Sequence, residues 1–141
     1  YKVVSGALGV NVNPSGTDGR IDASNDIVAY STSDERLKEN VSTIKSSLSK
    51  VLQIRGVEFD WKPLTEEEKK TIHGNEGHDV GVIAQEIEKV LPEVVTEREN
   101  GYKAVRYEKI VPLLIEAIKE QSDTIEKLTE RINKLEKGSN N

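Results

Sequence analysis

The chain has 141 residues, enough for one domain or a small domain with extensions, and its net charge of −5 argues against a nucleic-acid-binding surface. It has no cysteine, which excludes disulfides and thiolate metal sites, and no apolar run approaches the ~20 residues that span a bilayer, so no membrane partner is expected. Hydrophobic residues make up 35% of the chain and aromatic residues 4%, so we expect a modest core that oligomerisation supplements. Because residue 1 is tyrosine and not a start methionine, we expect a piece of a longer protein.

The first thirty residues alternate short runs of β-forming residues with Gly, Asn, Asp, Pro and Ser. Such alternation is typical of strands separated by turns. Because these strands would bury little by themselves, we predict that residues 1–33 are the end of a β-rich body that lies upstream. The predicted strands are Lys2–Val4, Leu8–Val12 and Ile27–Tyr30.

Residues 34–107 are predicted to form a small α+β core. Apolar residues recur every three or four positions over 35–54, the pattern of an amphipathic helix, and Gly56 is expected to end it. The remaining predictions are strands at 57–61 and 79–84, helices at 64–72 with Thr65 as N-cap and at 85–91, and a β-hairpin turning at Asn100-Gly101.

An apolar heptad pattern predicts a long C-terminal helix over residues 108–137. A seam of this kind is typical of a coiled coil, and the alternative is an amphipathic helix packed within one chain. Residues 138–141 are expected to be a disordered tail. The seam comprises Val111, Ile118, Ile125 and Ile132 at its a positions, and Leu114, Gln121, Leu128 and Leu135 at its d positions.

Two features of the seam disagree about the number of helices in the coil. Isoleucine at a with leucine at d favours two parallel helices. Residues 131–136, RINKLE, match an Arg–apolar–x–x–apolar–Glu motif of short three-stranded coils, in which Arg131 meets Glu136 of a neighbour. We follow the motif and predict a homotrimer in which Gln121 fixes the register. The predicted fold is α+β, with a β-rich N-terminal extension and a long C-terminal coiled-coil helix.

The segment 31–40, STSDERLKEN, allows two interpretations. One is structural, because serine or threonine followed three residues later by an acidic residue resembles the capping box that begins a helix. The other is chemical, with Ser33 as a nucleophile and Lys38 as its base. Residues at this spacing meet only if the chain turns between them or if they belong to different subunits. The candidate capping pairs are Ser31 with Asp34 and Thr32 with Glu35.

No metal site is predicted. His73 and His78, in the loop HGNEGH, could bind a metal together with Glu76 or Asp79, but no helix fixes a converging set of ligands, and a polar surface loop accounts for the pattern. The glycine-rich stretch GALGVNVNPSG lacks the Gly-Lys-Ser/Thr ending of a phosphate-binding loop. We therefore predict no cofactor, with nucleotide binding left open.

Three motifs, in this order, resemble the intramolecular chaperone auto-processing domain: SDERLKENV, GVIAQEIEKVLPEVV and YEKIVPLLIEAIKEQ. This domain closes phage tailspikes, tail fibres, neck appendages and endosialidases, and it also occurs in the myelin regulatory factor. The resemblance runs from Thr32 to about Leu135. It implies a homotrimer at the C-terminal end of a β-structured fibre, which brings the chains into register and then cuts itself off.

The resemblance also implies a catalytic site. Cleavage would fall between Ser33 and Asp34, with Ser33 as the nucleophile, Lys38 as its base and Asp34 as the residue after the cut. Residues 1–33 would stay with the fibre, and residues 34–141 would leave a virion precursor assembled in the host cytoplasm. The alternatives are a trimerisation domain that does not cut and a host-binding fibre tip.

Overall fold

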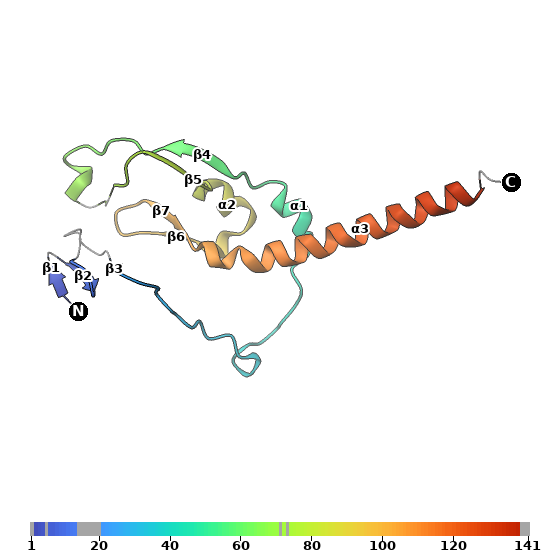
Figure 1. The fold of residues 1–141 in the computed structure, drawn as a ribbon, viewed down its shortest axis with the longest axis horizontal. Coiled ribbons are helices and arrows are strands. Elements are labelled where there is room, and N and C mark those ends of the chain that lie inside the picture. Colours follow the sequence, from blue (N-terminus) through green and yellow to red (C-terminus); the bar gives the residue numbers. More distant parts are fainter. Residues whose placement is uncertain (1, 5, 14–20, 71, 73, 139–141) are drawn as a thin grey trace. The chain divides into compact units, whose positions relative to one another are not determined.

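The computed structural model describes residues 2–4, 6–13, 21–70, 72 and 74–138. Short strands and short helices are combined with one long C-terminal helix (Figure 1), which confirms the predicted mixture of α and β structure. Contacts within the chain divide it into two compact units, 1–41 with 62–76 and 42–61 with 77–141. The domain boundaries predicted after residues 33 and 107 stay predictions.

The first unit begins with a three-stranded sheet in the order β1-β2-β3. β1 (Lys2–Val4) runs antiparallel to β2 (Ala7–Val10), and β2 runs parallel to β3 (Ile21–Ala23). Gly6 lies between β1 and β2 with a positive φ of 76°, which glycine adopts without steric cost, so the chain can turn tightly there. The described N-terminal residues are therefore β-structured, as predicted.

The strand predicted at Ile27–Tyr30 is wrong. Residues 24–34 contain neither helix nor strand, and the side chains of Ile27 and Val28 are exposed. The third strand lies earlier, at β3, where Ile21 pairs with Leu8. Strand propensity reports mainly how well a residue fits a pleated, half-buried surface, and residues 27–30 face no such surface.

The helix predicted at 35–54 is also wrong. Only two short pieces form, a 3-10 turn η1 (Glu35–Leu37) and a helix α1 (Ser47–Val51). Asn40 and Ser46 each have a positive φ of 54°, a left-handed conformation that interrupts a right-handed helix. The serine and threonine side chains in this stretch also offer the backbone alternative hydrogen bonds. Residues 38–46 are therefore irregular.

The capping prediction for Thr65 is confirmed, although its helix is short. Thr65 Oγ1 accepts a hydrogen bond from the backbone N–H of Glu68 at 3.3 Å, and Glu68 Oε2 accepts one from the backbone N–H of Thr65 at 2.9 Å. These reciprocal bonds form a capping box. The helix expected at 64–72 is reduced to a 3-10 turn, η2 (Glu68–Lys70).

The second unit contains two antiparallel strand pairs and the helix α2 (Ala84–Val90). Ile87 of α2 and Val94 are buried. Gly101 has a positive φ of 80° at the turn between β6 and β7, which confirms the predicted hairpin. The other elements are β4 (Val57–Asp60) paired with β5 (His78–Gly81), η3 (Pro92–Val94), β6 (Val95–Glu97) paired with β7 (Lys103–Val105), and η4 (Tyr107–Lys109).

The long helix α3 (Val111–Gly138) confirms the predicted C-terminal helix. Its N-terminal part packs against α1, and there the Leu113 and Ala117 side chains are only 0% and 4% exposed. From residue 121 onward its side chains are exposed, and the helix extends beyond the rest of its unit (Figure 1). Of the predicted tail, Gly138 belongs to α3, and residues 139–141 lie outside the described residues.

A single carboxylate on α3 caps α1. Glu120 Oε1 accepts a hydrogen bond from the backbone N–H of Ser47 at 2.8 Å, and Oε2 accepts one from the backbone N–H of Leu48 at 2.9 Å. These two bonds satisfy N–H groups that the first turn of a helix leaves without intrahelical partners. The same bonds, that from Leu48 first, lower the pKa of the Glu120 carboxyl. Glu120 therefore ties α1 to α3 as a carboxylate.

We predict that Glu120→Gln lowers the melting temperature by a few degrees at neutral pH, because an amide offers one acceptor oxygen where the carboxylate offers two. The pKa of Glu120 is lowered in the folded chain, so its stabilisation is complete above the unfolded pKa of about 4.3 and is lost as the pH falls through the folded value. Thermal unfolding from pH 7 to pH 3 should show the gap between variant and wild type closing in acid. Glu126→Gln, an exposed change on the same helix, is the control, and a gap that stays constant with pH would contradict the prediction.

Candidate functional site

The serine and the lysine of the segment 31–40 lie side by side. Lys38 Nζ is 2.8 Å from Ser33 Oγ, which is hydrogen-bonding distance. The 3-10 turn η1 lies between the two residues and brings them to the same side of the chain. One chain therefore supplies the contact that the chemical interpretation requires, while the roles of nucleophile and base stay predictions.

Asp34 caps this turn. Its Oδ1 accepts a hydrogen bond from the backbone N–H of Arg36 at 2.9 Å, and its backbone is extended (φ −64°, ψ 132°), as is usual for an N-cap residue. The structural interpretation placed the cap at Ser31 or Thr32, but both lie in irregular chain before the turn. Because Asp34 supplies the cap, the hydroxyl of Ser33 is left to contact Lys38.

The guanidinium of Arg36 donates hydrogen bonds to both carboxylate oxygens of Asp34. Arg36 Nε donates to Asp34 Oδ1 at 3.0 Å, and Arg36 Nη2 donates to Oδ2 at 2.7 Å. These side-chain bonds, followed by the bond from the Arg36 backbone N–H, lower the pKa of the Asp34 carboxyl below its ordinary value. Arg36 was not among the residues singled out from the sequence. The signal that could have indicated it is an arginine two positions after an N-cap aspartate.

The turn is preformed but open to solvent. Backbone hydrogen bonds from Leu37 N–H to the Asp34 carbonyl at 3.1 Å and from Lys38 N–H to the Glu35 carbonyl at 2.9 Å hold its shape. All residues from 24 to 43 are exposed in the single chain, Ser33 and Lys38 among them. Anything that excludes water from this pair must therefore come from outside the segment.

The predicted seam residues share one exposed face of α3. Leu113 and Ala117, the buried residues of α3, lie on a different face of the helix, and α3 packs against α1. The packing within one chain therefore leaves the seam uncovered, and its role in assembly stays a prediction. The exposed seam residues are Val111, Leu114, Ile118, Gln121, Ile125, Leu128, Arg131, Ile132, Leu135 and Glu136.

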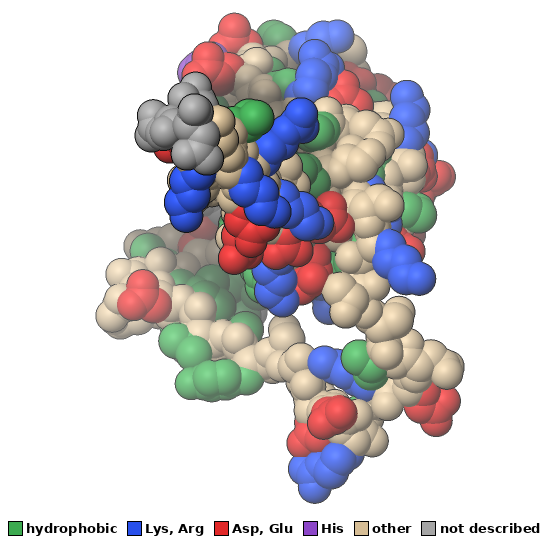
Figure 2. Space-filling model, turned by 90° about the vertical axis from the view of Figure 1, so that its right-hand side faces the viewer, with side chains coloured by type: hydrophobic (Ala, Val, Ile, Leu, Met, Phe, Trp, Pro, Cys, Tyr) green, Lys and Arg blue, Asp and Glu red, His purple; other side chains and the backbone are tan. Residues whose placement is uncertain are grey.

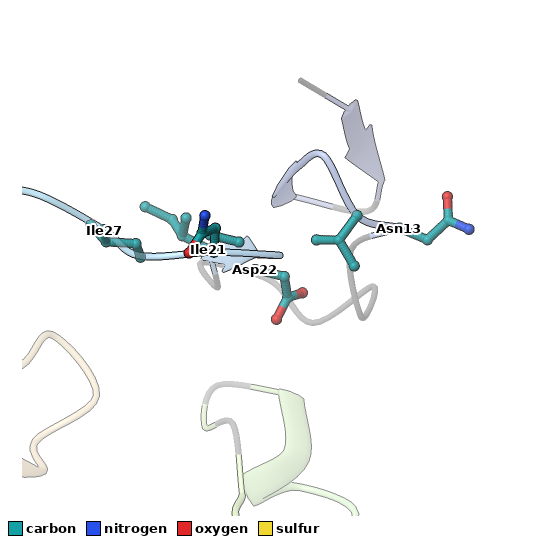
Figure 3. Close-up of a pocket in the computed structure, with 7 residues that line it drawn as sticks. Asn13, Ile21, Asp22 and Ile27 are labelled. Carbon is teal, nitrogen blue, oxygen red and sulfur yellow. The ribbon is translucent and has the colours of Figure 1, made fainter.

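The other candidate sites bring few metal-ligating or polar side chains together in the described part of the chain. His78 Nδ1 lies 3.1 Å from Asp60 Oδ1, His73 falls outside the described residues, and no group of three metal-ligating side chains forms within the described part of the chain. A pocket of about 450 Å³ lies beside β3. Two of the residues that line it, Asn13 and Asp22, point in different directions and so do not form a joint ligand set (Figure 3).

The surface charges and the helices can be compared with what a charged binding surface or a membrane span requires. On the face shown in Figure 2, acidic and basic side chains are intermingled, and neither sign forms a broad surface of its own. Within the described ranges, no helix has the length and apolar character that crossing a bilayer requires.

Comparison with known proteins finds a family whose first matched residue is Ser33. Residues 33–96 match the family model described as the chaperone of endosialidase, which is named among the peptidases. The chain is 33% identical over 109 residues to Long tail fiber protein Gp37 of Enterobacteria phage K3, an alignment that covers 73% of the chain and 8% of the relative. The corresponding protein of Enterobacteria phage T2 matches with the same identity and coverage.

The chain thus spans only a small part, 8%, of the length of these curated relatives. The matched stretch starts at Ser33, includes Lys38 and runs through β4, β5 and α2 to Thr96. These matches confirm the resemblance read from the three motifs. Through residues 33–96, the chain is similar to the chaperone-of-endosialidase family.

Proposed function

We propose that this chain is the C-terminal intramolecular chaperone of a phage fibre or tailspike, which trimerises, brings the fibre chains into register and then releases itself by autoproteolysis. The observation that carries the proposal is the hydrogen bond of 2.8 Å between Lys38 Nζ and Ser33 Oγ, at the residue where the family match begins. The fibre as partner is supported by the relatives, which are phage long tail fibre proteins.

The cleavage chemistry uses Ser33 as the nucleophile and Lys38 as the base. A lysine serves as a base at neutral pH once burial or a neighbouring cation disfavours its ammonium form. The neutral amine of Lys38 then accepts the hydroxyl proton of Ser33, and the oxygen attacks a backbone carbonyl carbon. In the net reaction one peptide bond is hydrolysed, which leaves a carboxylate on Ser33 and an amine on Asp34.

The first residue of the released fragment shows which peptide bond is cut. We assign the cut to the bond between Ser33 and Asp34, which the family resemblance implies. Within one chain, attack of Ser33 Oγ on the carbonyl of Thr32 closes an unstrained ring and breaks the bond before Ser33, whereas attack on its own carbonyl closes a strained one. A cut after Ser33 therefore favours attack from a neighbouring copy. The released fragment begins with Asp34 in the assigned case and with Ser33 in the other.

Trimerisation rests on the uncovered seam of α3. A row of apolar residues along one face of a long helix is costly to leave in water and is covered in a coiled coil by the same face of another copy. Arg131 and Glu136 stand at the edges of the seam, where they can pair between neighbouring helices. Gln121 supplies a polar layer that disfavours shifted registers. The proposed domains are therefore 34–107 as chaperone core and 108–137 as coil, behind residues 1–33 of the fibre.

A removable clamp suits a fibre. Long β-structured fibres form mostly non-local contacts, which are slow to form and expose strand edges on the way. Joining the chains at one end raises their effective concentration to about the millimolar range. In this proposal the precursor assembles in the host cytoplasm, and the fragment 34–141 leaves on maturation. Without the chaperone, an unfolded fibre would lack the nucleus for refolding, so the mature fibre is held in its folded state kinetically.

The experiment is a time course of the freshly expressed chain on denaturing gels, with intact mass and N-terminal sequencing of each product. The proposal expects the full-length band to give way to a fragment of residues 34–141 beginning with Asp34. A second candidate, a trimerisation domain that does not cut, is favoured by the exposure of Ser33 and Lys38 in the single chain. A trimer that stays full length under all conditions would support that candidate.

A further inference from the structure

An apolar groove opens in the second unit beside the start of α3. Its volume is about 360 Å³, and a cavity of about 150 Å³ already accommodates a benzene ring, so the groove has room for two aliphatic side chains. Almost all of its wall is hydrophobic. The lining residues are Val51, Ile54, Gly56, Val82, Tyr107, Ile110, Val111 and Leu114.

The groove is continuous with the predicted seam. Val111 and Leu114 line the groove and also occupy the first a and d positions of the seam. In the proposed coiled coil, a neighbouring copy approaches α3 along these residues. The mouth of the groove therefore lies where a second copy of this chain comes closest.

The segment that follows Ser33 and carries Lys38 also carries two apolar side chains that are exposed in the single chain. We call residues 34–41 the strap. Leu37 and Val41, on either side of Lys38, are each 72% exposed in the single chain. Burying two such side chains is favourable, because apolar surface is removed from water. The strap thus has an apolar face for which the single chain provides no cover.

We propose that the groove of one copy receives Leu37 and Val41 from the strap of the neighbouring copy. This inference rests on the homotrimer of the proposed function. Each copy offers one strap and one groove, so the contact is head-to-tail, and a head-to-tail contact closes into a ring under a threefold rotation. The groove has room for two aliphatic side chains, and Leu37 and Val41 are two aliphatic side chains that the single chain leaves exposed.

Docking would change the surroundings of the cleavage pair. Lys38 lies between the two docking side chains and contacts Ser33 at 2.8 Å, so burial of Leu37 and Val41 carries the pair against the apolar wall of the neighbour. Exclusion of water there favours the neutral amine that the base requires. Cleavage would then begin only after the copies have assembled, which protects unassembled chains from early loss of the chaperone.

Filling the groove, or removing a side chain of the strap that occupies it, should slow cleavage without dissociating the trimer. Gly56→Leu adds a side chain in the wall of the groove where no atom lies within 4 Å of the new Cβ, and Leu37→Asn removes one occupant. We expect each variant to remain trimeric by light scattering and to be cut at least about tenfold more slowly. Leu52→Asn is the matched control, because Leu52 is 78% exposed and belongs to neither surface. Trimers of both variants that are cut at the wild-type rate would overturn the docking.

A cross-linking test does not depend on cleavage and separates this inference from the proposed function. The chain has no cysteine, so Leu37→Cys with Gly56→Cys in a Ser33→Ala background introduces one pair per copy. Mild oxidation should give dimers and trimers on a non-reducing denaturing gel, while Leu37→Cys with Lys127→Cys should not. A monomer-sized oxidised product would place the strap in the groove of its own chain, and the absence of any cross-link would show that strap and groove do not meet. Either result would overturn docking between copies, even if wild-type cleavage is observed.

Discussion

Replacing Ser33 by alanine is expected to abolish release of residues 34–141 and to leave the trimer intact. Alanine has no hydroxyl for Lys38 to deprotonate, and removal of the nucleophile lowers the rate of such a reaction by roughly 10⁴-fold or more. Ser33 is exposed and contributes no cap to η1, so its loss should not disturb the fold. Densitometry of a denaturing-gel time course, beside light scattering of the same sample, measures both outcomes.

Two companion variants make this prediction specific. Lys38→Arg keeps the positive charge but cannot act as a base, since the guanidinium stays protonated, so cleavage should fall by roughly 10²- to 10⁴-fold. Ser31→Ala changes another exposed serine of the same segment and should be cut at the wild-type rate. If Ser33→Ala were processed normally, the contact of 2.8 Å between Lys38 and Ser33 would have only a local structural role.

Elements with strong local signals could be predicted from the sequence. The hairpin at Asn100-Gly101 forms because glycine supplies the positive φ of its turn, and α3 forms over a sustained heptad pattern. The helix expected at 35–54 had a comparable apolar spacing but does not form. Its residues Leu37 and Val41 face solvent in the single chain, so the periodicity has no packing partner to stabilise it.

The site followed partly from the sequence. The sequence predicts Ser33 and Lys38 as a pair that can meet within one chain only if the chain turns between them. The turn that meets this requirement depends on Asp34, which serves as N-cap and is held by Arg36, and the sequence reading placed the cap earlier. The groove beside α3 could not be predicted, because its residues come from three separate stretches of chain that meet only after folding.

Ile125→Asp is expected to convert the trimer to monomers and to abolish cleavage with it. Ile125 lies in the middle of the seam, is 57% exposed in the single chain and has no role in the packing of α1 against α3. In a three-stranded coil the substitution would bring three carboxylates together in an apolar layer, and unpaired buried charge costs several kcal/mol for each group. Because the side chain faces solvent in the monomer, each separate chain should still fold.

Light scattering gives the mass of the assembly, and a denaturing-gel time course gives the extent of cleavage. Lys127→Asp introduces the same side chain two positions later, off the seam, and should leave both trimer and cleavage unchanged. A monomeric Ile125→Asp chain that cuts itself at the wild-type rate would show that one copy suffices for catalysis. A trimer that survives the substitution would place the contacts between copies elsewhere than on the apolar face of α3. Loss of both together, with Lys127→Asp unaffected, is the result expected if neighbouring copies complete the surroundings in which Ser33 becomes reactive.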